Sequence, residues 1–249
     1  MTTNVLLITG ASRGIGRAIA LKAATAGWAV VVNYLSNQAA AEEVVAHIRG
    51  TGGQAQAVQG DVSVEADVLR MFADADRLGT LTGAVVNAGI VAPPSMLADM
   101  PVERLRRMFD VNVLGAYLCA REAARRMMKS RGGTGGSLVL VTSMAAVLGS
   151  PGEYVDYAGS KAAVDTLVTG LAKELGPEGV RVNAVRPGVI DTEIHASGGQ
   201  PERAWKRGVN APLGRPGTAD EVAEAVLWLL SEAASYTSGS HLEVSGGLR

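Results

Sequence analysis

Short apolar runs rich in β-branched residues alternate along the chain with longer, Ala-rich amphipathic stretches. The runs lack a strict alternation of apolar and polar residues, which is the pattern of strands covered on both faces. The longer stretches carry apolar residues at helical spacing. The pattern predicts strands at 4–9, 29–34, 54–61, 83–88, 137–143, 180–188 and 241–246, and helices at 14–26, 37–50, 65–77, 101–129, 155–175 and 218–231.

This alternation of strand and helix predicts an α/β fold, a doubly wound parallel sheet of about seven strands with helices on both faces. No linker and no change of composition divides the chain, so 1–249 is expected to form one domain. Two stretches depart from the rhythm. The long helical stretch 101–129 is interrupted by Asn112 and Gly115, where we expect a bend. The stretch 189–217 is rich in Gly and Pro, and an irregular insertion of this length is usually a lid or binding loop.

Charge and cysteine content exclude several classes of protein. A net charge of −1 and a pI near 6.3 leave no basic surface for nucleic acid. Cys119 is the single cysteine and lies in an apolar run, so we expect an unreactive, buried thiol in a reducing cytoplasm. The N-terminal residues read neither as a signal peptide nor as a membrane span. His47, His195 and His241 lack metal-ligand spacing, so no metal is expected.

The first predicted strand runs directly into "TGASRGIG", residues 9–16, with glycines at positions 10, 14 and 16. Glycine permits both a tight turn and a close approach of the backbone to a ligand. Backbone N–H groups at the start of the following helix form an anion site that suits the pyrophosphate of a dinucleotide. A plain strand-to-helix turn is the alternative, but the position after the first strand favours nucleotide binding.

The stretch "YVDYAGSK" places two tyrosines ahead of Lys161. On a helix Tyr157 lies one turn from Lys161 and on the same face, whereas Tyr154 lies about 10 Å from it at the helix entrance. An ammonium close to a phenol lowers its pKa from about 10 and suits it to proton transfer. Tyr157 is therefore predicted to be the general acid/base and Tyr154 a wall of the substrate pocket. Ser143 ends a strand where ligands bind, and its hydroxyl can stabilise an oxyanion.

Several motifs occur in a fixed order: "TGASRGIG", "VNAG" at 86–89, "VTS" at 141–143, "YAGSK" at 157–161, "NAVRPG" at 183–188 and a C-terminal "SGG". Over essentially its whole length the chain resembles the short-chain dehydrogenase/reductase family. The resemblance implies a Rossmann-type fold, an NAD or NADP cofactor and a carbonyl or secondary-alcohol substrate. It also implies a catalytic set of Asn112, Ser143, Tyr157 and Lys161, in which Asn112 bends its helix, binds a water and completes a proton relay.

The same resemblance implies a set of nucleotide-binding residues. Asp61 is expected to contact the adenine, Asn87 to stabilise the sheet beside the cofactor, Lys161 to hold the nicotinamide ribose and Thr192 to contact the carboxamide. The full set is Gly10, Ser12, Arg13, Gly14, Ile15, Gly16, Asn33, Ser36, Asp61, Val62, Asn87, Ala88, Gly89, Tyr157, Lys161, Pro187, Gly188, Ile190 and Thr192.

The end of the second strand favours NADP over NAD. An NAD enzyme usually places a carboxylate there to bond the ribose 2′-hydroxyl, whereas this chain has Asn33 and no acid before Glu42. Arg13 can supply positive charge, and Ser36 and Asn37 can donate hydrogen bonds. The basic residue that many NADP enzymes carry just after this strand is missing, since Leu35 and Ser36 stand in its place. NAD therefore stays open as the alternative.

The substrate is less well defined. A 3-oxoacyl-[acyl-carrier-protein] reductase would need basic residues at the pocket mouth, for which Lys129, Arg131 and Lys173 are candidates, although ordinary solvated helix ends explain them equally well. A sugar dehydrogenase such as glucose 1-dehydrogenase is suggested by "VNYLSN", but the rim "MAAVLGSPGEY" is mostly apolar. This rim also holds one residue more between Ser143 and Tyr157 than is usual in the family. An alternative from a different class of protein is a non-catalytic nucleotide-binding regulator. Such a protein would not need the four catalytic residues.

Two predicted helices carry more apolar residues than one buried face requires, which predicts a homotetramer. The stretch 101–129 and the stretch 162–175 are apolar on more than one side, which usually means burial on more than one side. The resemblance implies a two-fold interface through these helices and a second one through the C-terminal strand and tail. Two isologous interfaces give D2 symmetry. A monomer that buries these residues in its own core is the alternative.

Overall fold

The computed structural model describes residues 3–249 and has a seven-stranded parallel sheet in the order β3-β2-β1-β4-β5-β6-β9. The strands are β1 (Asn4–Ile8), β2 (Ala29–Tyr34), β3 (Ala55–Gln59), β4 (Thr80–Val86), β5 (Gly136–Val141), β6 (Val180–Pro187) and β9 (His241–Val244). The order reverses between β1 and β4, and ligands of such sheets bind at this switch point, beyond the carboxyl ends of the strands. The predicted fold class is confirmed.

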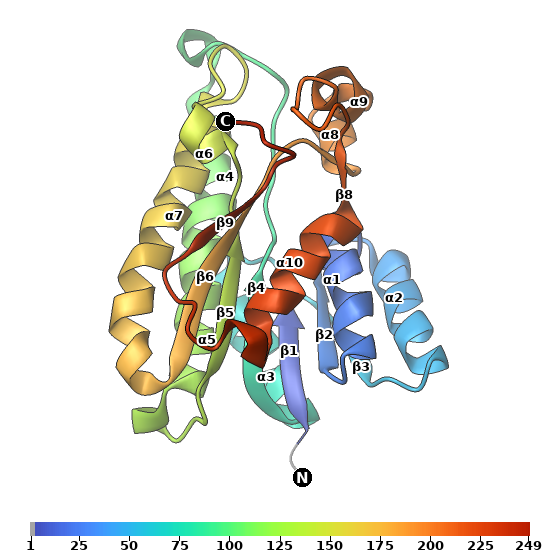
Figure 1. Cartoon of the computed structure of the whole chain (residues 1–249), viewed down its shortest axis with the longest axis vertical. Helices are drawn as coiled ribbons and strands as arrows, with labels where there is room; N and C mark the ends of the chain where they lie inside the picture. The colour runs from blue at the N-terminus through green and yellow to red at the C-terminus, as the bar shows by residue number, and fades with distance from the viewer. Residues whose placement is uncertain (1–2) are drawn as a thin grey trace.

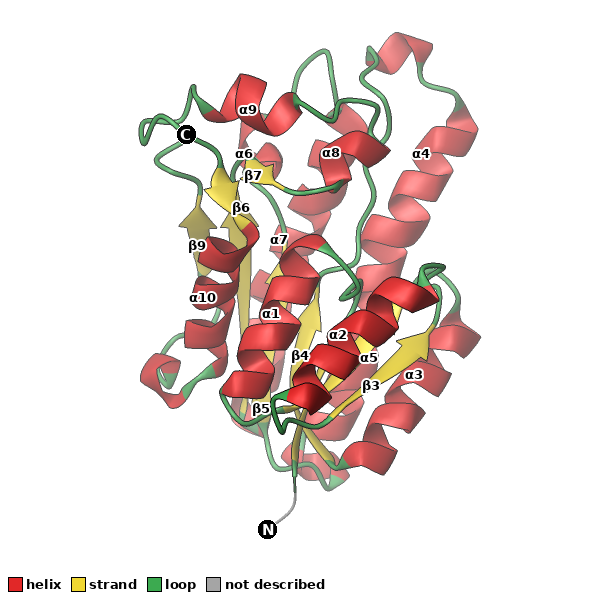
Figure 2. Cartoon of the chain, turned by 90° about the vertical axis from the view of Figure 1, so that its right-hand side faces the viewer, coloured by secondary structure: helices red, strands yellow, loops and turns green. Residues whose placement is uncertain are grey.

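Helices cover both faces of the sheet (Figures 1 and 2). One face carries α1 (Gly14–Thr25), α2 (Gln38–Gly50) and α10 (Ala219–Leu230), and the other carries α3 (Glu65–Leu78), α5 (Gly115–Met127) and α7 (Val155–Leu175). No helix formed by residues 3–249 is long and apolar enough to cross a membrane.

The strand β1 shows why the apolar runs lack alternation. Val5 and Leu7 pack into the core beneath α3 and α5, whereas Leu6 and Ile8 pack into the core beneath α1 and α10. All four side chains are buried. A strand with a hydrophobic core on each face needs apolar side chains at every position, which explains the continuous runs in the sequence.

The expected interruption within 101–129 is present. Helix α4 (Val102–Phe109) ends in a π-helical turn at Asp110–Leu114, and α5 begins at Gly115. The side chain of Asn112 is buried and bonds the backbone of Ile90, accepting from its N–H at 2.8 Å and donating to its carbonyl at 3.0 Å. A Cβ on Gly115 would lie 2.8 Å from Val62 Cγ2, so the small residue lets the bent helix approach the end of β3.

The stretch 189–217 forms short elements above the carboxyl ends of the strands (Figure 1). It contains β7 (Ile190–Asp191), α8 (Ile194–Ser197) and α9 (Arg203–Gly208), and it ends at β8 (Gly217–Thr218), which pairs with β7 in a separate two-stranded sheet. On the other side of the same opening lies the four-residue helix α6 (Ala145–Leu148). The segment 189–217, which the sequence predicted to be irregular, therefore lies at the end of the sheet where a ligand is expected to bind.

Candidate active site

The glycine loop between β1 and α1 is locked against the end of β4. Gly10 and Gly14 have φ angles of +64° and +53°, which side chains with a Cβ rarely adopt. A Cβ on Gly16 would lie 2.7 Å from Asn87 Nδ2, so this position requires glycine for close packing. Asn87 Nδ2 donates to the carbonyl oxygens of Thr9 and Gly10 at 2.9 and 3.1 Å. The loop is thus held in shape by hydrogen bonds from the next strand of the sheet.

The side chain of Asn33, at the end of β2, is hydrogen-bonded to the protein backbone. Its side chain is 2% exposed and lies under the glycine loop, where its Oδ1 accepts from Gly10 N at 3.1 Å. Its Nδ2 is directed at backbone carbonyls of the second and third strands, including that of Gly60 at 3.1 Å. Asn33 also lines the cavity described next, and its role in nucleotide binding stays a prediction. The exposed side chain at this point is Leu35, two residues further on.

A cavity of about 320 Å³ extends from the glycine loop along the end of β2. The predicted nucleotide residues that line it are Gly10, Ser12, Arg13, Gly14, Ile15, Asn33, Ser36, Asp61, Val62, Asn87, Ala88, Gly89 and Thr192. Asp61 accepts hydrogen bonds from Ser63 N and Oγ at 2.9 and 2.6 Å and pairs with Arg107 at 3.3 Å. Burial opposes its ionisation, but these hydrogen bonds and the arginine charge together lower the pKa of Asp61.

A second cavity of about 200 Å³ lies beyond the ends of β5 and β6. Ser143 follows β5, and Tyr157 and Lys161 lie on the first two turns of α7. The predicted residues that line this cavity are Ile15, Asn87, Gly89, Ser143, Tyr157, Lys161, Pro187, Gly188, Ile190 and Thr192. Four of them, Ile15, Asn87, Gly89 and Thr192, also line the first cavity, so the two cavities adjoin. Gly16 and Asn112 line neither of the two cavities.

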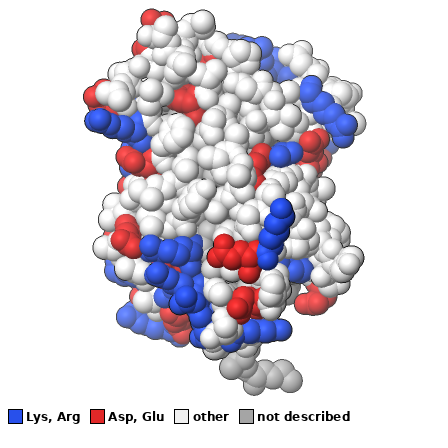
Figure 3. Space-filling view, turned by 90° about the vertical axis from the view of Figure 1, so that its left-hand side faces the viewer, with Lys and Arg blue, Asp and Glu red and all other residues white. Residues whose placement is uncertain are grey.

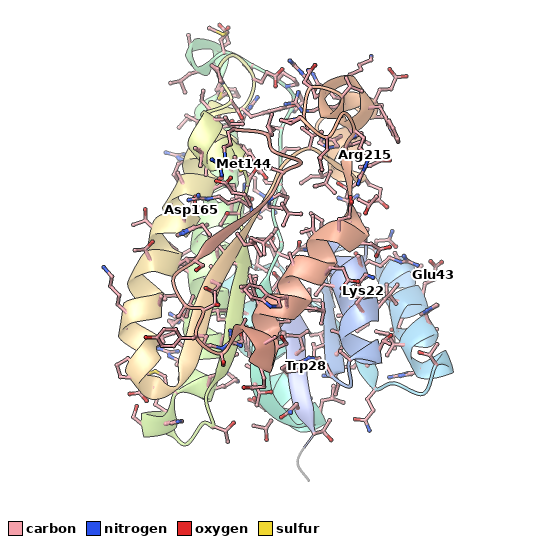
Figure 4. The ribbon with its side chains drawn as sticks, in the orientation of Figure 1. Lys22, Trp28, Glu43, Met144, Asp165 and Arg215 are labelled. Atoms are coloured by element: carbon pink, nitrogen blue, oxygen red, sulfur yellow. The ribbon has the colours of Figure 1, made fainter. Side chains whose placement is uncertain are left out.

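The charge on Lys161 is buried. Its side chain donates to the Val141 carbonyl at 2.8 Å, and burial lowers its pKa to about 8, although the charge of Asp165 opposes the shift. Asp165 lies one turn further along α7 (Figure 4), and its carboxylate pairs with Arg186 of β6 at 2.9 Å. Lys161 therefore changes charge within an ordinary working range of pH.

Tyr157 differs from expectation in its pKa. Burial raises the pKa of the phenol, and the hydrogen bond with Ser143 opposes this shift. Lys161 Nζ lies 5.8 Å from the centre of the Tyr157 ring and is bonded to a backbone carbonyl instead. The predicted lowering of the phenol pKa by Lys161 is therefore not seen in this structure.

Asn112 lies next to the catalytic residues without facing the cavity. A Cβ on Gly89 would lie 3.3 Å from both Asn112 Oδ1 and Lys161 Nζ, so the two side chains flank this glycine. Asn112 Nδ2 also donates to Ser160 Oγ at 3.1 Å. The side chain of Asn112 thus fixes the π-helical turn against the loop after β4 and against α7.

Residues of the stretch 189–217 and the C-terminus complete the catalytic cavity, and the sequence did not single them out. His195, Arg203 and Leu248 line it together with Tyr154, which was predicted as a wall. The Tyr154 hydroxyl donates to Gln200 Oε1 at 3.2 Å. His195 and Arg203 come from the Gly- and Pro-rich segment that the sequence predicted to be a lid or binding loop, but no pattern within it singles out these two side chains. Ser150, in the lengthened rim, also lines the cavity and has a φ of +45°.

The structure also shows where the basic residues proposed to bind a carrier protein and the single cysteine lie. The bases proposed for a carrier protein do not lie at the pocket mouth. Lys129 and Arg131 precede β5, and Lys173 is in the last turn of α7, so all three lie at the opposite end of the sheet from Ser143. Cys119 is fully buried, and burial raises its pKa to about 12, as expected of a packing residue.

The residues fit a dinucleotide. The glycine cradle, whose third glycine leaves no room for a side chain, opens into a cavity lined by Asp61 that adjoins the cavity lined by Lys161. Backbone N–H groups at the start of α1 suit a pyrophosphate. Among residues 3–249 no group of three His, Cys, Asp or Glu side chains is arranged to hold a metal ion.

Comparisons with known proteins agree with this geometry. A family model described as enoyl-(acyl carrier protein) reductase matches residues 10–249. The chain is 50% identical over 244 residues to an uncharacterized oxidoreductase of Escherichia coli, YgfF, covering 98% of this chain and 99% of that one. It is 40% identical to an L-rhamnose 1-dehydrogenase (NAD(P)(+)) of Sphingomonas, over 98% and 95% of the two chains. A crystal structure of a short-chain type dehydrogenase/reductase from Mycobacterium marinum matches with a TM-score of 0.90 and 38% identity, covering 98% and 94%.

Proposed function

The chain belongs to the short-chain dehydrogenase/reductase family of oxidoreductases, which bind NAD(P) and act on CH–OH and C=O groups, and we propose that it is an NADP-dependent member with Tyr157 as its general acid/base. The observation that carries the proposal is the meeting of the two cavities at Ile15, Asn87, Gly89 and Thr192. A dinucleotide that follows the first cavity reaches the second one beside Ser143, Tyr157 and Lys161.

Bound NADPH would supply the hydride, and the side chains of the chain itself handle the oxygen of the substrate. Ser143 and Tyr157 each donate a hydrogen bond to the carbonyl oxygen, which polarises it and stabilises the negative charge that develops there. The phenol of Tyr157 then gives its proton to that oxygen. Because burial raises the pKa of its phenol, Tyr157 is suited to hold this proton until it is transferred.

NADP is favoured by the residues at the end of β2. Among residues 33–37, which include the end of β2, there is no carboxylate to repel a 2′-phosphate. Arg13 and Arg107 both line the cavity, and Arg107 partly neutralises Asp61. Asp61 and Glu193 line the same cavity, so the support for NADP is the lack of a carboxylate at the end of β2 rather than a positive surplus of the whole cavity.

A panel of carbonyl substrates tests this proposal. NADPH absorbance is followed with acetoacetyl thioesters, glucose (in the oxidative direction, with NADP), quinones and simple ketones side by side, and each active substrate is repeated with NADH. We expect turnover with at least one carbonyl compound and a higher kcat/KM with the NADP pair. A higher kcat/KM with the NAD pair would contradict the coenzyme assignment, and the absence of turnover would favour a nucleotide-binding regulator.

The organisation of the chain is part of the proposal. We infer that 1–249 acts as one nucleotide-binding domain in the cytoplasm and that 189–217 is its substrate lid. In support, α8 and α9 lie over the catalytic cavity and contribute His195 and Arg203 to its lining. Limited proteolysis tests the lid: bound NADPH should protect 189–217 more than the rest of the chain.

We further propose a homotetramer. Leu118, Val164 and Val168 are buried within the chain, but Phe109, Leu114 and Tyr117 stay exposed on the π-turn and the helices beside it. The side of the molecule that carries α7 shows a broad area free of charged residues (Figure 3). β9 is an edge strand that pairs only with β6 among the described strands, and Trp228 on α10 is exposed. Sedimentation at micromolar concentration should give a tetramer, and a single species near 25.6 kDa would contradict it.

A further inference from the structure

The second cavity is lined by two hydrogen-bond donors, Tyr154 and Arg203, that converge on one oxygen. The Tyr154 hydroxyl and Arg203 Nη1 each donate to Gln200 Oε1 at 3.2 Å. Both Tyr154 and Arg203 line the cavity, whereas the accepting oxygen belongs to a side chain that does not. Both hydrogen bonds to Gln200 are at the long end of the normal range. The acceptor is a neutral amide oxygen, whereas a guanidinium and a phenol form stronger hydrogen bonds with a charged acceptor.

Arg203 is held in place for this role. Its Nη2 pairs with Glu153 at 2.7 Å, and its guanidinium lies over the Tyr154 ring, 4.9 Å from the ring centre. The side chain is only 17% exposed. A planar guanidinium that is fixed on one edge and stacked on one face presents its remaining N–H groups in a defined direction.

The local charges leave a positive surplus. Glu153 pairs with Arg207 as well as with Arg203, so two cations share one carboxylate. The next cation, Arg104, is already neutralised by a two-point contact with Asp156 at 2.8 and 3.1 Å. Since two cations share Glu153, this side of the cavity favours an anion.

We propose that Tyr154 and Arg203 anchor a carboxylate of the substrate, so that the enzyme acts on short oxo acids and the corresponding hydroxy acids. The inference rests on the proposed function. Gln200 Oε1 occupies the position of one carboxylate oxygen, and the substrate displaces it. Tyr154 is the residue immediately before α7, and both it and Tyr157 line the same cavity, so one small molecule can contact both side chains. The cavity volume of about 200 Å³ agrees with a small molecule.

A matched pair of substrates tests the anchor. The wild-type enzyme is assayed with NADPH against levulinate and methyl levulinate, which have the same ketone but differ in charge. We expect a kcat/KM at least about tenfold higher for the acid, the size of one charge-assisted contact. In Arg203→Gln the ratio of acid to ester should fall towards one, and in Arg203→Lys it should be intermediate. Arg207→Gln is the control, because it removes the same charge from the same Glu153 but from outside the cavity.

Ligand binding gives a readout that does not depend on turnover. The enzyme–NADPH complex is titrated with pentanoate and with pentanamide, and the nicotinamide fluorescence is followed. The wild type should bind the carboxylate at least about tenfold more tightly, and Arg203→Gln should lose this preference while its melting temperature and NADPH affinity report that it is folded. If no carbonyl compound is reduced but pentanoate is still preferred, the proposed function fails and the anchor stands. Equal binding of the two ligands by the wild type, or an equal loss in Arg207→Gln, overturns the anchor.

Discussion

The glycine loop and the segment 189–217 both border the active site, but different forces hold them. The backbone of the loop is itself fixed by hydrogen bonds, because Thr9 and Gly10 carbonyls accept from the Asn87 side chain and Gly10 N–H donates to the Asn33 side chain. The segment is joined to the rest of the chain mainly by side chains, through Arg203–Glu153 and Tyr154–Gln200. Large apolar residues stay exposed in the segment, whereas the strands under the loop are buried.

The difference separates two tasks of the enzyme. A loop locked by the sheet presents the same surface to every molecule of coenzyme and needs no rearrangement when it binds. Side-chain contacts with a few polar partners can be exchanged for contacts with a substrate. We infer that the chemistry is built into the rigid part of the molecule and the choice of substrate into the segment 189–217. The following substitutions test that division, from the largest expected effect to the smallest.

Tyr157→Phe should remove most of the turnover. The ring still packs, but the proton donor is lost, and general acid catalysis is worth about 10²–10⁴-fold. Coenzyme binding, measured by NADPH fluorescence, should be nearly unchanged. Tyr154→Phe is the matched control on the same helix entrance, and it should reduce kcat/KM only several-fold. If Tyr154→Phe were the inactive variant, the assignment of the two tyrosines would be reversed.

Gly16→Ala should weaken coenzyme binding and destabilise the glycine loop. The added methyl group would collide with the Gly10 carbonyl and with Asn87, so the cradle must open. We expect the coenzyme dissociation constant to rise by more than about tenfold, together with a lower melting temperature, since overpacking costs about 1–3 kcal/mol. Gly50→Ala at the end of α2 is the control, because no atom lies within 4 Å of its added Cβ. A Gly16→Ala protein with normal coenzyme affinity would show that the cradle adapts.

Leu35→Asp should shift the coenzyme preference towards NAD. The side chain is 51% exposed and lines the first cavity, so a carboxylate there would repel a 2′-phosphate. We expect the kcat/KM ratio of NADP to NAD to fall by about tenfold, the size of one lost charge contact. Asn33→Asp should instead destabilise the protein, because a carboxylate has no donor for the Gly60 carbonyl. A clean coenzyme switch in Asn33→Asp would confirm the role that the sequence first gave to this residue.

The affinity for NADPH should fall a few-fold as the pH rises through about 8, where Lys161 loses its proton. Asp165 raises the pKa of this lysine, so Asp165→Asn should move the fall to lower pH. Lys161→Met should abolish this dependence. Titrations of NADPH fluorescence across pH check both, and an identical profile in wild type and Lys161→Met would assign the dependence to another group.

The sequence predicted the rigid part well because local rules determine it. The apolar runs, the glycines at positions 10, 14 and 16 and the spacing of Tyr157 and Lys161 each report on a neighbouring backbone or helix turn. The bend at Asn112 could be foreseen for the same reason.

Three features could not be predicted from the sequence because they depend on packing between segments that are distant along the chain. Asn33 turned inward, since Gly10 and Gly60 offer it partners from two other segments. The pKa of Tyr157 is raised, since burial by the surrounding elements outweighs the hydrogen bond to Ser143. Arg203 reaches the cavity only because Glu153, 50 positions earlier, holds its guanidinium. No pattern within either segment indicates such a contact.

Transfer of an isotope tests the central claim most directly. The protein is incubated with NADPH deuterated on the transferring carbon of the nicotinamide and with the best ketone of the substrate panel, and the alcohol product is analysed by mass spectrometry and NMR. The account predicts that one deuterium appears on the carbinol carbon of the product and that Tyr157→Phe suppresses its formation. A protein that binds NADPH but forms no deuterated alcohol with any member of the panel would contradict it.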